Sequence, residues 1–228
     1  MSEQPQPTCW EPLEATPEAL TALTRALGVS SHTFVPAWDW EALEATTPLV
    51  LLYPTLPELE SFRQQREIIA ADATQLYFMR QIVGGACGTV AVLHALMNGV
   101  PGASLQNSPL VEWRETTYSL DKSAIQERST SILEHIKIRE AHNLAAATNH
   151  PPNTPSQAGI RQGRHFVTFI HQNGLLWELD GRRNAPQCLG DTTAVSEIQR
   201  ILQASHHPRV HLETVVLALV PIESACAS

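Results

Sequence analysis

The segment QIVGGACGT, from Gln81 to Thr89, contains a residue that can act as a nucleophile. Gly84 and Gly85 predict a tight turn, and Cys87 follows at the start of an apolar helix. Unpaired backbone N–H groups and the helix dipole favour an anion there, so we expect a lowered thiol pKa. The same N–H groups can hold an oxyanion, with the Gln81 amide as a second donor. A small buried cysteine beside helix-packing glycines is the alternative interpretation.

A candidate base and a residue that could orient it lie further along the chain. His165 opens the run HFVTFI and Asp180 ends the run LLWELD, and Asn-Gly between such runs indicates a hairpin. A Gln172-Asn173 loop would place His165 opposite Asp180, whereas an Asn173-Gly174 loop would make the two residues diagonal neighbours. In both registers they share one face, and the imidazole can donate to the carboxylate. Alternatively, His165 caps a strand and Asp180 merely begins an Asp-Gly turn.

Together these residues form the nucleophile, base and orienting carboxylate of a cysteine hydrolase, provided that the fold brings them together. No metal or cofactor is required by this chemistry. The four cysteines are scattered and lack metal-ligand spacing. We expect the other three cysteines, Cys9, Cys188 and Cys226, to be spectators, and His94 to pack inside a helix core.

The elements that must position these groups are indicated by caps and apolar spacing. Thr16, Pro17 and Gly28 bound a helix whose leucines repeat at helical intervals. The run Gly88–Asn98 is apolar nearly all round, which is typical of a central core helix. Further helices are expected at 58–73, twice within 108–142, and at 196–204, and buried strands at 49–53 and 215–220.

The stretch Ala145–Arg164 carries three prolines, two glycines and almost no large apolar residue, so we expect a structureless loop. It joins the cysteine half of the candidate site to the histidine half. A loop there can cross the active site and limit what reaches it, or be an ordinary surface insertion. With no linker elsewhere, we predict a single domain over 1–228, of α/β class, with a central sheet flanked by helices on both faces.

Composition excludes several classes of function. The net charge of −8 argues against nucleic-acid binding. It would favour a basic partner, and solubility alone is the alternative explanation. No apolar run is long enough for a membrane helix, and the amino-terminal residues do not form a signal peptide. Reduced thiols and a cytoplasmic location are therefore expected.

Two motifs resemble those of the ubiquitin C-terminal hydrolase family, short single-domain type (peptidase family C12). The family pattern is roughly YFMKQ-x-x-x-N-x-CGT, and Tyr77 to Thr89 read YFMRQIVGGACGT. The family's second motif is a His-Phe strand followed by YELDGR, and here His165-Phe166 precede WELDGR at Trp177–Arg182. The opening WEPLEATPEAL is similar to the family's WLPLEANPE.

The resemblance implies that Cys87 is the nucleophile, His165 the base, Asp180 the orienter and Gln81 an oxyanion donor. It implies a papain-like site in an α/β fold with a knotted backbone. It also implies a monomeric thiol protease without a cofactor that removes small adducts from ubiquitin, with NEDD8 as a second substrate.

The resemblance further implies that Pro12 and Leu13 contact ubiquitin, and the basic tail of ubiquitin suggests an acidic groove. Three positions depart from the family pattern. Gly85 replaces the usual Asn, which implies a looser turn. Pro36 stands where relatives often carry an acidic ubiquitin contact, and Arg164 stands where an apolar residue is usual. A generic cysteine peptidase and an inactive ubiquitin-binding module are the rival interpretations.

Overall fold

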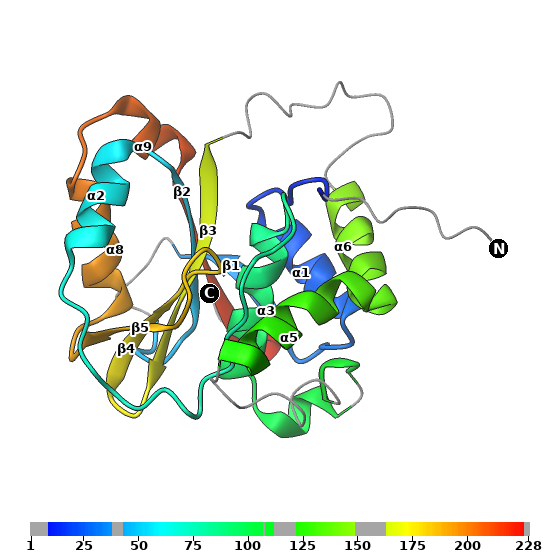
Figure 1. Cartoon of the computed structure of the whole chain (residues 1–228). Helices are drawn as coiled ribbons and strands as arrows, with labels where there is room; N and C mark the ends of the chain where they lie inside the picture. Colours follow the sequence, from blue (N-terminus) through cyan, green and yellow to red (C-terminus); the bar gives the residue numbers. More distant parts are fainter. Residues whose placement is uncertain (1–8, 38–42, 107, 112–121, 149–162, 226–228) are drawn as a thin grey trace.

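The computed structural model describes residues 9–37, 43–106, 108–111, 122–148 and 163–225. These residues build a six-stranded antiparallel sheet with strand order β1-β6-β2-β3-β4-β5 (Figure 1). The strands are β1 (His32–Pro36), β2 (Leu49–Pro54), β3 (Arg164–Gln172), β4 (Leu175–Leu179), β5 (Gln187–Gly190) and β6 (Val215–Pro221). The predicted strands at 49–53 and 215–220 are confirmed as β2 and β6.

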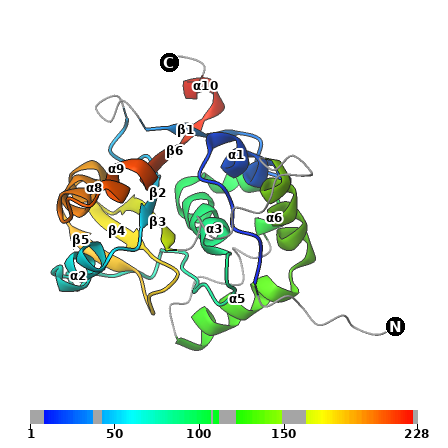
Figure 2. The same ribbon diagram turned by 90° about the horizontal axis from the view of Figure 1, so that it is seen from above.

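Helices cover both faces of this sheet, as predicted (Figure 1, Figure 2). One face carries α1 (Pro17–Ala26), α3 (Cys87–Gly99), α5 (Lys122–Glu134) and α6 (Ile136–Thr148). The opposite face carries α2 (Pro57–Gln65), α8 (Ala194–Gln203) and α9 (Pro208–Glu213). The short η1 (Gly102–Leu105) and α10 (Ile222–Ala225) complete the described elements. No helix in the described ranges has the length and apolar character needed to cross a membrane.

Local sequence accounts for the helices that position the cysteine half of the site. The Thr16 hydroxyl accepts a hydrogen bond from the Ala19 N–H, Pro17 is the first residue of α1, and Gly28 adopts a φ of 79° just beyond it. Helix α3 is apolar all round, and ten of its residues are buried between α1 and the sheet. The predicted boundaries of both helices are therefore confirmed.

The β3–β4 hairpin settles the register that the sequence left open. Gln172 pairs with Leu175, so Asn173-Gly174 is the two-residue loop. Both loop residues have positive φ angles, 55° and 77°, as a type I′ turn requires. The same register makes Asp180 the diagonal neighbour of His165, and the two side chains lie on the same face.

Two expected boundaries are wrong. The helix predicted over 58–73 ends at Gln65, and the following chain turns to the sheet edge, where the Ile69 N–H donates to the Cys188 carbonyl. The loop predicted over Ala145–Arg164 is shorter than expected, because α6 continues to Thr148 and β3 begins at Arg164. Its remaining part, 149–162, lies outside the described residues. Ala145 and Ala146 of α6 pack into the core. The segment has few large apolar residues, so the sequence did not indicate that it is buried.

Candidate active site

His165 and Asp180 form a buried pair at the open end of the β3–β4 hairpin. The Nε2 atom of His165 lies 2.7 Å from Oδ1 of Asp180, and the two residues are 4% and 1% exposed. The Arg182 backbone N–H donates to the same Oδ1 at 2.8 Å. Burial alone would raise the pKa of Asp180, but the bond to His165 and the charges of Arg63 and Arg182 hold it well below its usual range. Asp180 is therefore ionised and fixed toward the imidazole.

Cys87 is the first residue of α3 and is partly buried. Burial raises the pKa of the Cys87 thiol, although the backbone N–H groups of Phe166, Gly88 and Cys87 itself act in the opposite direction. The expectation of a lowered thiol pKa is wrong for this state, since desolvation outweighs the helix terminus. Burial likewise lowers the pKa of His165 below 6.5, against the opposing effect of Asp180. Both groups are therefore neutral near pH 7.

Gln81 is held by the turn that follows Asp180. Its backbone N–H donates to the Gly181 carbonyl at 2.8 Å, and its side-chain Nε2 donates to the Val83 carbonyl at 3.0 Å. A primary amide carries two N–H donors, so one remains for another acceptor. An added Cβ on Gly181 would lie 3.0 Å from the Gln81 Cβ, so a side chain at Gly181 would require Gln81 to shift by a few tenths of an ångström.

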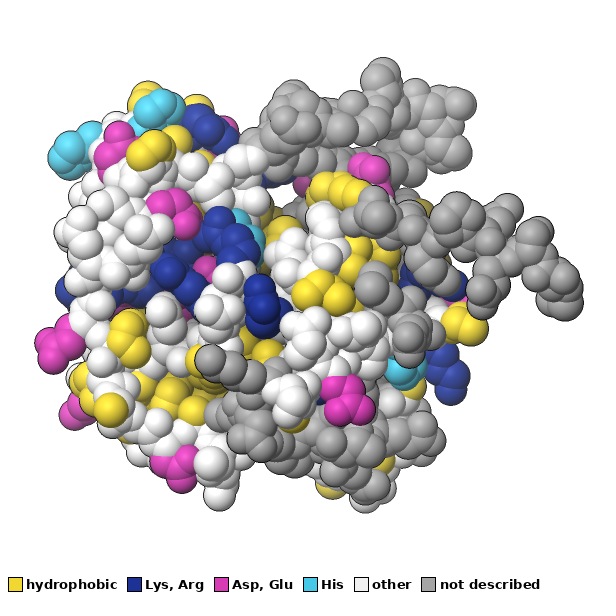
Figure 3. Space-filling view, in the orientation of Figure 1, with side chains coloured by type: hydrophobic (Ala, Val, Ile, Leu, Met, Phe, Trp, Pro, Cys, Tyr) yellow, Lys and Arg dark blue, Asp and Glu magenta, His cyan; other side chains and the backbone are white. Residues whose placement is uncertain are grey.

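One cavity of about 650 Å³ brings the predicted chemical residues of both halves together. Cys87, Gln81 and His165 all line it, and the amino-terminal segment Cys9–Leu13 forms another wall. The Trp10 N–H donates to the Gly84 carbonyl at 2.7 Å, which ties this segment beside the start of α3 (Figure 2). Among the described residues, the lining holds Arg164 and Arg182 and one carboxylate, that of Glu11, so this cavity itself is not acidic. Figure 3 shows Lys and Arg side chains gathered near the middle of this face.

Gly85 is a structural requirement of this site. Its φ is +76°, and an added Cβ would lie 2.0 Å from the Trp10 carbonyl oxygen. The expected loosening of the turn is therefore wrong: absence of a side chain lets the Trp10 backbone pack directly on the turn. The family's usual Asn does not fit at Gly85 in this arrangement.

We expect Gly85→Asn to lower the free energy of unfolding by about 2–4 kcal/mol, from the positive φ and the backbone clash. Urea titration followed by circular dichroism measures this loss. Gly174→Asn is the matched control, since Gly174 has a φ of +77° but nothing within 4 Å of an added Cβ. Equal losses for the two variants would show that the contact with Trp10 is unimportant.

Leu13 does not offer the exposed surface expected of a ubiquitin contact. It is 4% exposed, and its side chain packs against Gly88 at the start of α3. Pro12 is only partly buried and lines the cavity. A contact through this segment therefore depends more on Pro12 than on Leu13, whose substitution by a charged residue would disturb the core.

The remaining expectations concern residues away from the chemistry. His94 is fully buried and stacks on Phe78 at 5.2 Å, and burial lowers its pKa to about 4, so its predicted core role is confirmed. Cys188 is buried, whereas Cys9 is exposed and lines the cavity. Cys226 lies outside the described residues. Within the described ranges, no three His, Cys, Asp or Glu side chains are grouped so as to hold a metal ion.

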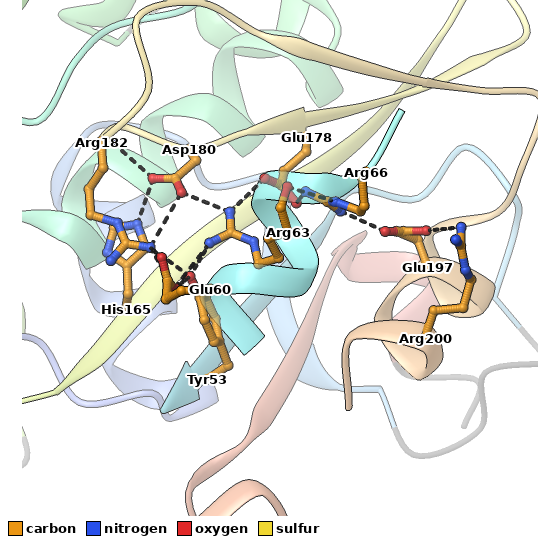
Figure 4. Close-up of polar contacts among 10 residues, drawn as sticks. All are labelled: Tyr53, Glu60, Arg63, Arg66, His165, Glu178, Asp180, Arg182, Glu197 and Arg200. Carbon is orange, nitrogen blue, oxygen red and sulfur yellow. Dashed lines mark hydrogen bonds and ion pairs between the residues drawn. The ribbon is translucent and has the colours of Figure 1, made fainter. Parts of the chain in front are cut away.

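A row of charged side chains behind Asp180 was not predicted from the sequence (Figure 4). Arg63 of α2 donates to Asp180 Oδ2 at 2.7 Å and to Glu178 Oε1 at 2.5 Å. The row alternates in sign and runs through Glu60, Arg182, Asp180, Arg63, Glu178, Arg66, Glu197 and Arg200. The three-residue spacing of Glu60, Arg63 and Arg66, along α2 and at its C-terminal end, was an available signal. From the sequence, this segment was expected only to form a helix.

The chain was compared with models of known protein families. The model of "Ubiquitin carboxyl-terminal hydrolase, family 1" (Peptidase_C12) matches residues 10–209. The chain belongs to this family. The family relationship makes it a cysteine peptidase, with thiol chemistry as predicted.

Curated relatives of this hydrolase family agree with the assignment. A probable ubiquitin carboxyl-terminal hydrolase of Dictyostelium discoideum is 33% identical over 197 residues, covering 76% of this chain and 71% of the relative. A ubiquitin carboxyl-terminal hydrolase of Drosophila melanogaster is 30% identical over 201 residues, covering 81% and 83%. The catalytic domain of Trichinella spiralis UCH37, solved bound to ubiquitin vinyl methyl ester, superposes with a TM-score of 0.70. Its identity is 21%, with 93% and 95% of the two chains covered. This chain and the UCH37 catalytic domain therefore share the same fold.

Proposed function

We propose that this chain removes small groups, such as short peptides, esters, amines and thiols, from the C-terminal glycine of ubiquitin. Cys87 is the nucleophile, His165 the base, Asp180 the orienter and Gln81 an oxyanion donor. The observation that carries the proposal is the single cavity that Cys87, Gln81 and His165 line, with Asp180 fixed behind the imidazole.

The hydrogen bond between His165 and Asp180 determines which ring nitrogen acts. An ionised carboxylate only accepts hydrogen bonds, so neutral His165 must carry its proton on Nε2. The Nδ1 lone pair is then available to take the proton of the Cys87 thiol. As this proton transfers, the sulfur attacks the carbonyl carbon of the ubiquitin glycine. Backbone N–H groups at the start of α3 and the free N–H of Gln81 stabilise the oxyanion.

Collapse of this intermediate breaks the bond to the leaving group, which receives the proton from His165. A thioester joins ubiquitin to Cys87 at this stage. Water then attacks the thioester carbon and gives a proton to His165, and the departing sulfur regains that proton. One water is consumed, and free ubiquitin and the leaving group are released.

The pKa directions of the two neutral groups predict the pH dependence. Protonated His165 cannot accept the thiol proton, so kcat/KM should rise with pH through the pKa of His165, which lies below 6.5. The rate should fall only above pH 9, where the thiol ionises without leaving an imidazolium to protonate the leaving group. Initial rates on a ubiquitin ester, measured from about pH 5 to above pH 9, test the prediction. A midpoint of the acid limb above 6.5 contradicts it.

The function is tested by rates on matched substrates. We expect fast hydrolysis of a ubiquitin C-terminal ester, slow hydrolysis of the ester of a tail peptide alone, and poor cleavage of di-ubiquitin. A NEDD8 ester measured in parallel decides whether the substrate range includes that modifier. Equal rates on the tail peptide would favour the generic cysteine peptidase. Tight ubiquitin binding without turnover would favour the binding module.

A reducing compartment such as the cytoplasm is proposed as the location, because the thiol must stay reduced.

A further inference from the structure

Arg63 lies between two carboxylates, those of Asp180 and Glu178. Asp180 orients His165 in the proposed reaction, whereas Glu178 has no role in it so far. One nitrogen of Arg63, Nη2, contacts both Asp180 and Glu178, and the Arg63 side chain is 0% exposed. Its other terminal nitrogen donates to the hydroxyl of Tyr53, whose ring meets the imidazole of His165 edge-on at 6.2 Å between centroids. A guanidinium buried this completely must be neutralised by its neighbours. Asp180 also serves His165, and Glu60 lies 3.5 Å from the other terminal nitrogen of Arg63, so Glu178 is the closest carboxylate that can neutralise Arg63.

The charge of Arg63 has opposite consequences for the two members of the pair. It lowers the pKa of Asp180, which keeps the carboxylate ionised. It also lowers the pKa of His165, which opposes the imidazolium that must form when the thiol proton is transferred. A second negative charge close to Arg63 reduces its effect on the pKa of His165, while the hydrogen bond between Arg63 and Asp180 is kept.

Glu178 supplies that charge and is itself locked in place. It is fully buried, with Oε1 at 2.5 Å from Arg63 and Oε2 at 2.7 Å from Arg66. Burial alone would raise the pKa of Glu178, but Arg63 and Arg66 keep it lowered, so the group is ionised. Glu178 lies near the end of β4 and Asp180 directly follows the strand, two residues further on, so both carboxylates point toward the same face (Figure 4).

We propose that Glu178 is a positioning residue for the reaction: it holds Arg63 against Asp180 and offsets the positive charge that Arg63 imposes on His165. The inference rests on the proposed function for the meaning of His165 as base. The electrostatic link itself concerns only the proton affinity of one histidine and can be measured without catalysis.

The groups that face His165 must all be considered for such a measurement. Cys87 of α3 and Tyr53 of β2 are neutral near pH 7, because burial raises the pKa of both. Arg182, in the turn after Asp180, lowers the pKa of His165, as Arg63 does. Glu60 of α2 pairs with Arg182 at 3.0 Å and offsets part of that charge. Glu60 also lies 3.5 Å from Arg63, but Glu178 is the closer counter-charge, at 2.5 Å, and it is fully buried.

The test is the titration of the His165 ring by NMR in a Cys87→Ser background, so that no thiol titrates beside the ring. We expect Glu178→Gln to lower the pKa of His165 by about half to one unit, since one nearby negative charge is lost. Glu178→Asp, which retains the charge, should leave the pKa near that of the parent. In the active enzyme, Glu178→Gln should move the acid limb of kcat/KM to lower pH. It should also reduce kcat by on the order of tenfold, with little change in KM.

Two further variants separate this role from a general loss of structure. Glu197→Gln is the matched control, because Glu197 is 1% exposed and pairs with Arg66 at 2.6 Å but contacts neither Arg63 nor Asp180. It should lower the melting temperature while leaving the pKa of His165 unchanged. Arg66→Gln removes a positive charge and should raise that pKa, which provides a test of opposite sign if Glu178→Gln does not fold.

The proposal is overturned if Glu178→Gln leaves the pKa of His165 unchanged or raises it, or if Glu197→Gln lowers it equally. With Glu178→Gln unfolded, an unchanged or lowered pKa in Arg66→Gln overturns it as well. These outcomes do not depend on whether Cys87 is the nucleophile. Failure of the proposed function would appear separately, as a wild-type enzyme that does not hydrolyse ubiquitin esters.

Discussion

Cys87→Ala should abolish turnover of a ubiquitin ester, with a fall in kcat on the order of 10⁴-fold or more. The thiol forms the covalent bond in the proposed reaction, and no other group in the described cavity can replace it at the start of α3. Binding of ubiquitin should persist within a fewfold, because the sulfur is used only in chemistry. Stopped assays for turnover and titration calorimetry for binding measure the two quantities.

The controls for this prediction are the other cysteines. Cys9→Ala is the most demanding, since Cys9 is exposed and lines the same cavity. It should remain active, as should Cys188→Ala and Cys226→Ala. Loss of turnover in any of these three variants, with melting temperature preserved, would move the nucleophile elsewhere.

His165→Ala should reduce kcat by about 10³–10⁴-fold on the same ester, because a neutral thiol of raised pKa then has no base. Asp180→Asn should cause a smaller loss. Its side-chain oxygen can still accept from His165 Nε2, whereas its amide nitrogen would face the donors of Arg63. Steady-state kinetics over pH 5 to 9 measures both effects.

The relative size of the two losses in kcat distinguishes the role of His165 from that of Asp180. A loss in Asp180→Asn that equals or exceeds the loss in His165→Ala would mean that the carboxylate does more than orient the ring. A His165→Ala enzyme that keeps an unchanged acid limb would mean that another group takes the thiol proton.

The parts of the fold that were predicted correctly depend on short-range signals. The cap at Thr16, the Asn-Gly signal for the β3–β4 hairpin and the apolar run of α3 each determine a local conformation, and the structure agrees at each place. The sequence could also show that His165 and Asp180 share a face, because that follows from strand alternation in either register.

The parts that were missed depend on tertiary contacts. Helix α2 ends at Gln65 because the following segment bonds to the edge of β5, which helix propensity does not report. The raised pKa of the Cys87 thiol comes from burial, a property of the assembled site. Gly85 indicated a loose turn only because the Trp10 carbonyl that packs on it is distant in sequence. The carboxylates that bind Arg63, Glu178 and Asp180, are likewise distant from it in sequence.

The most direct test of the account is labelling with ubiquitin that carries a C-terminal vinyl methyl ester, followed by peptide mapping. The probe needs both recognition of ubiquitin and a reactive thiol at the position of the scissile carbonyl. We expect one ubiquitin to be added per chain, on Cys87, and no adduct in Cys87→Ser. An adduct on Cys9 instead, or no adduct on a folded wild-type chain, would contradict the assignment of this cavity as the site where ubiquitin adducts are cleaved.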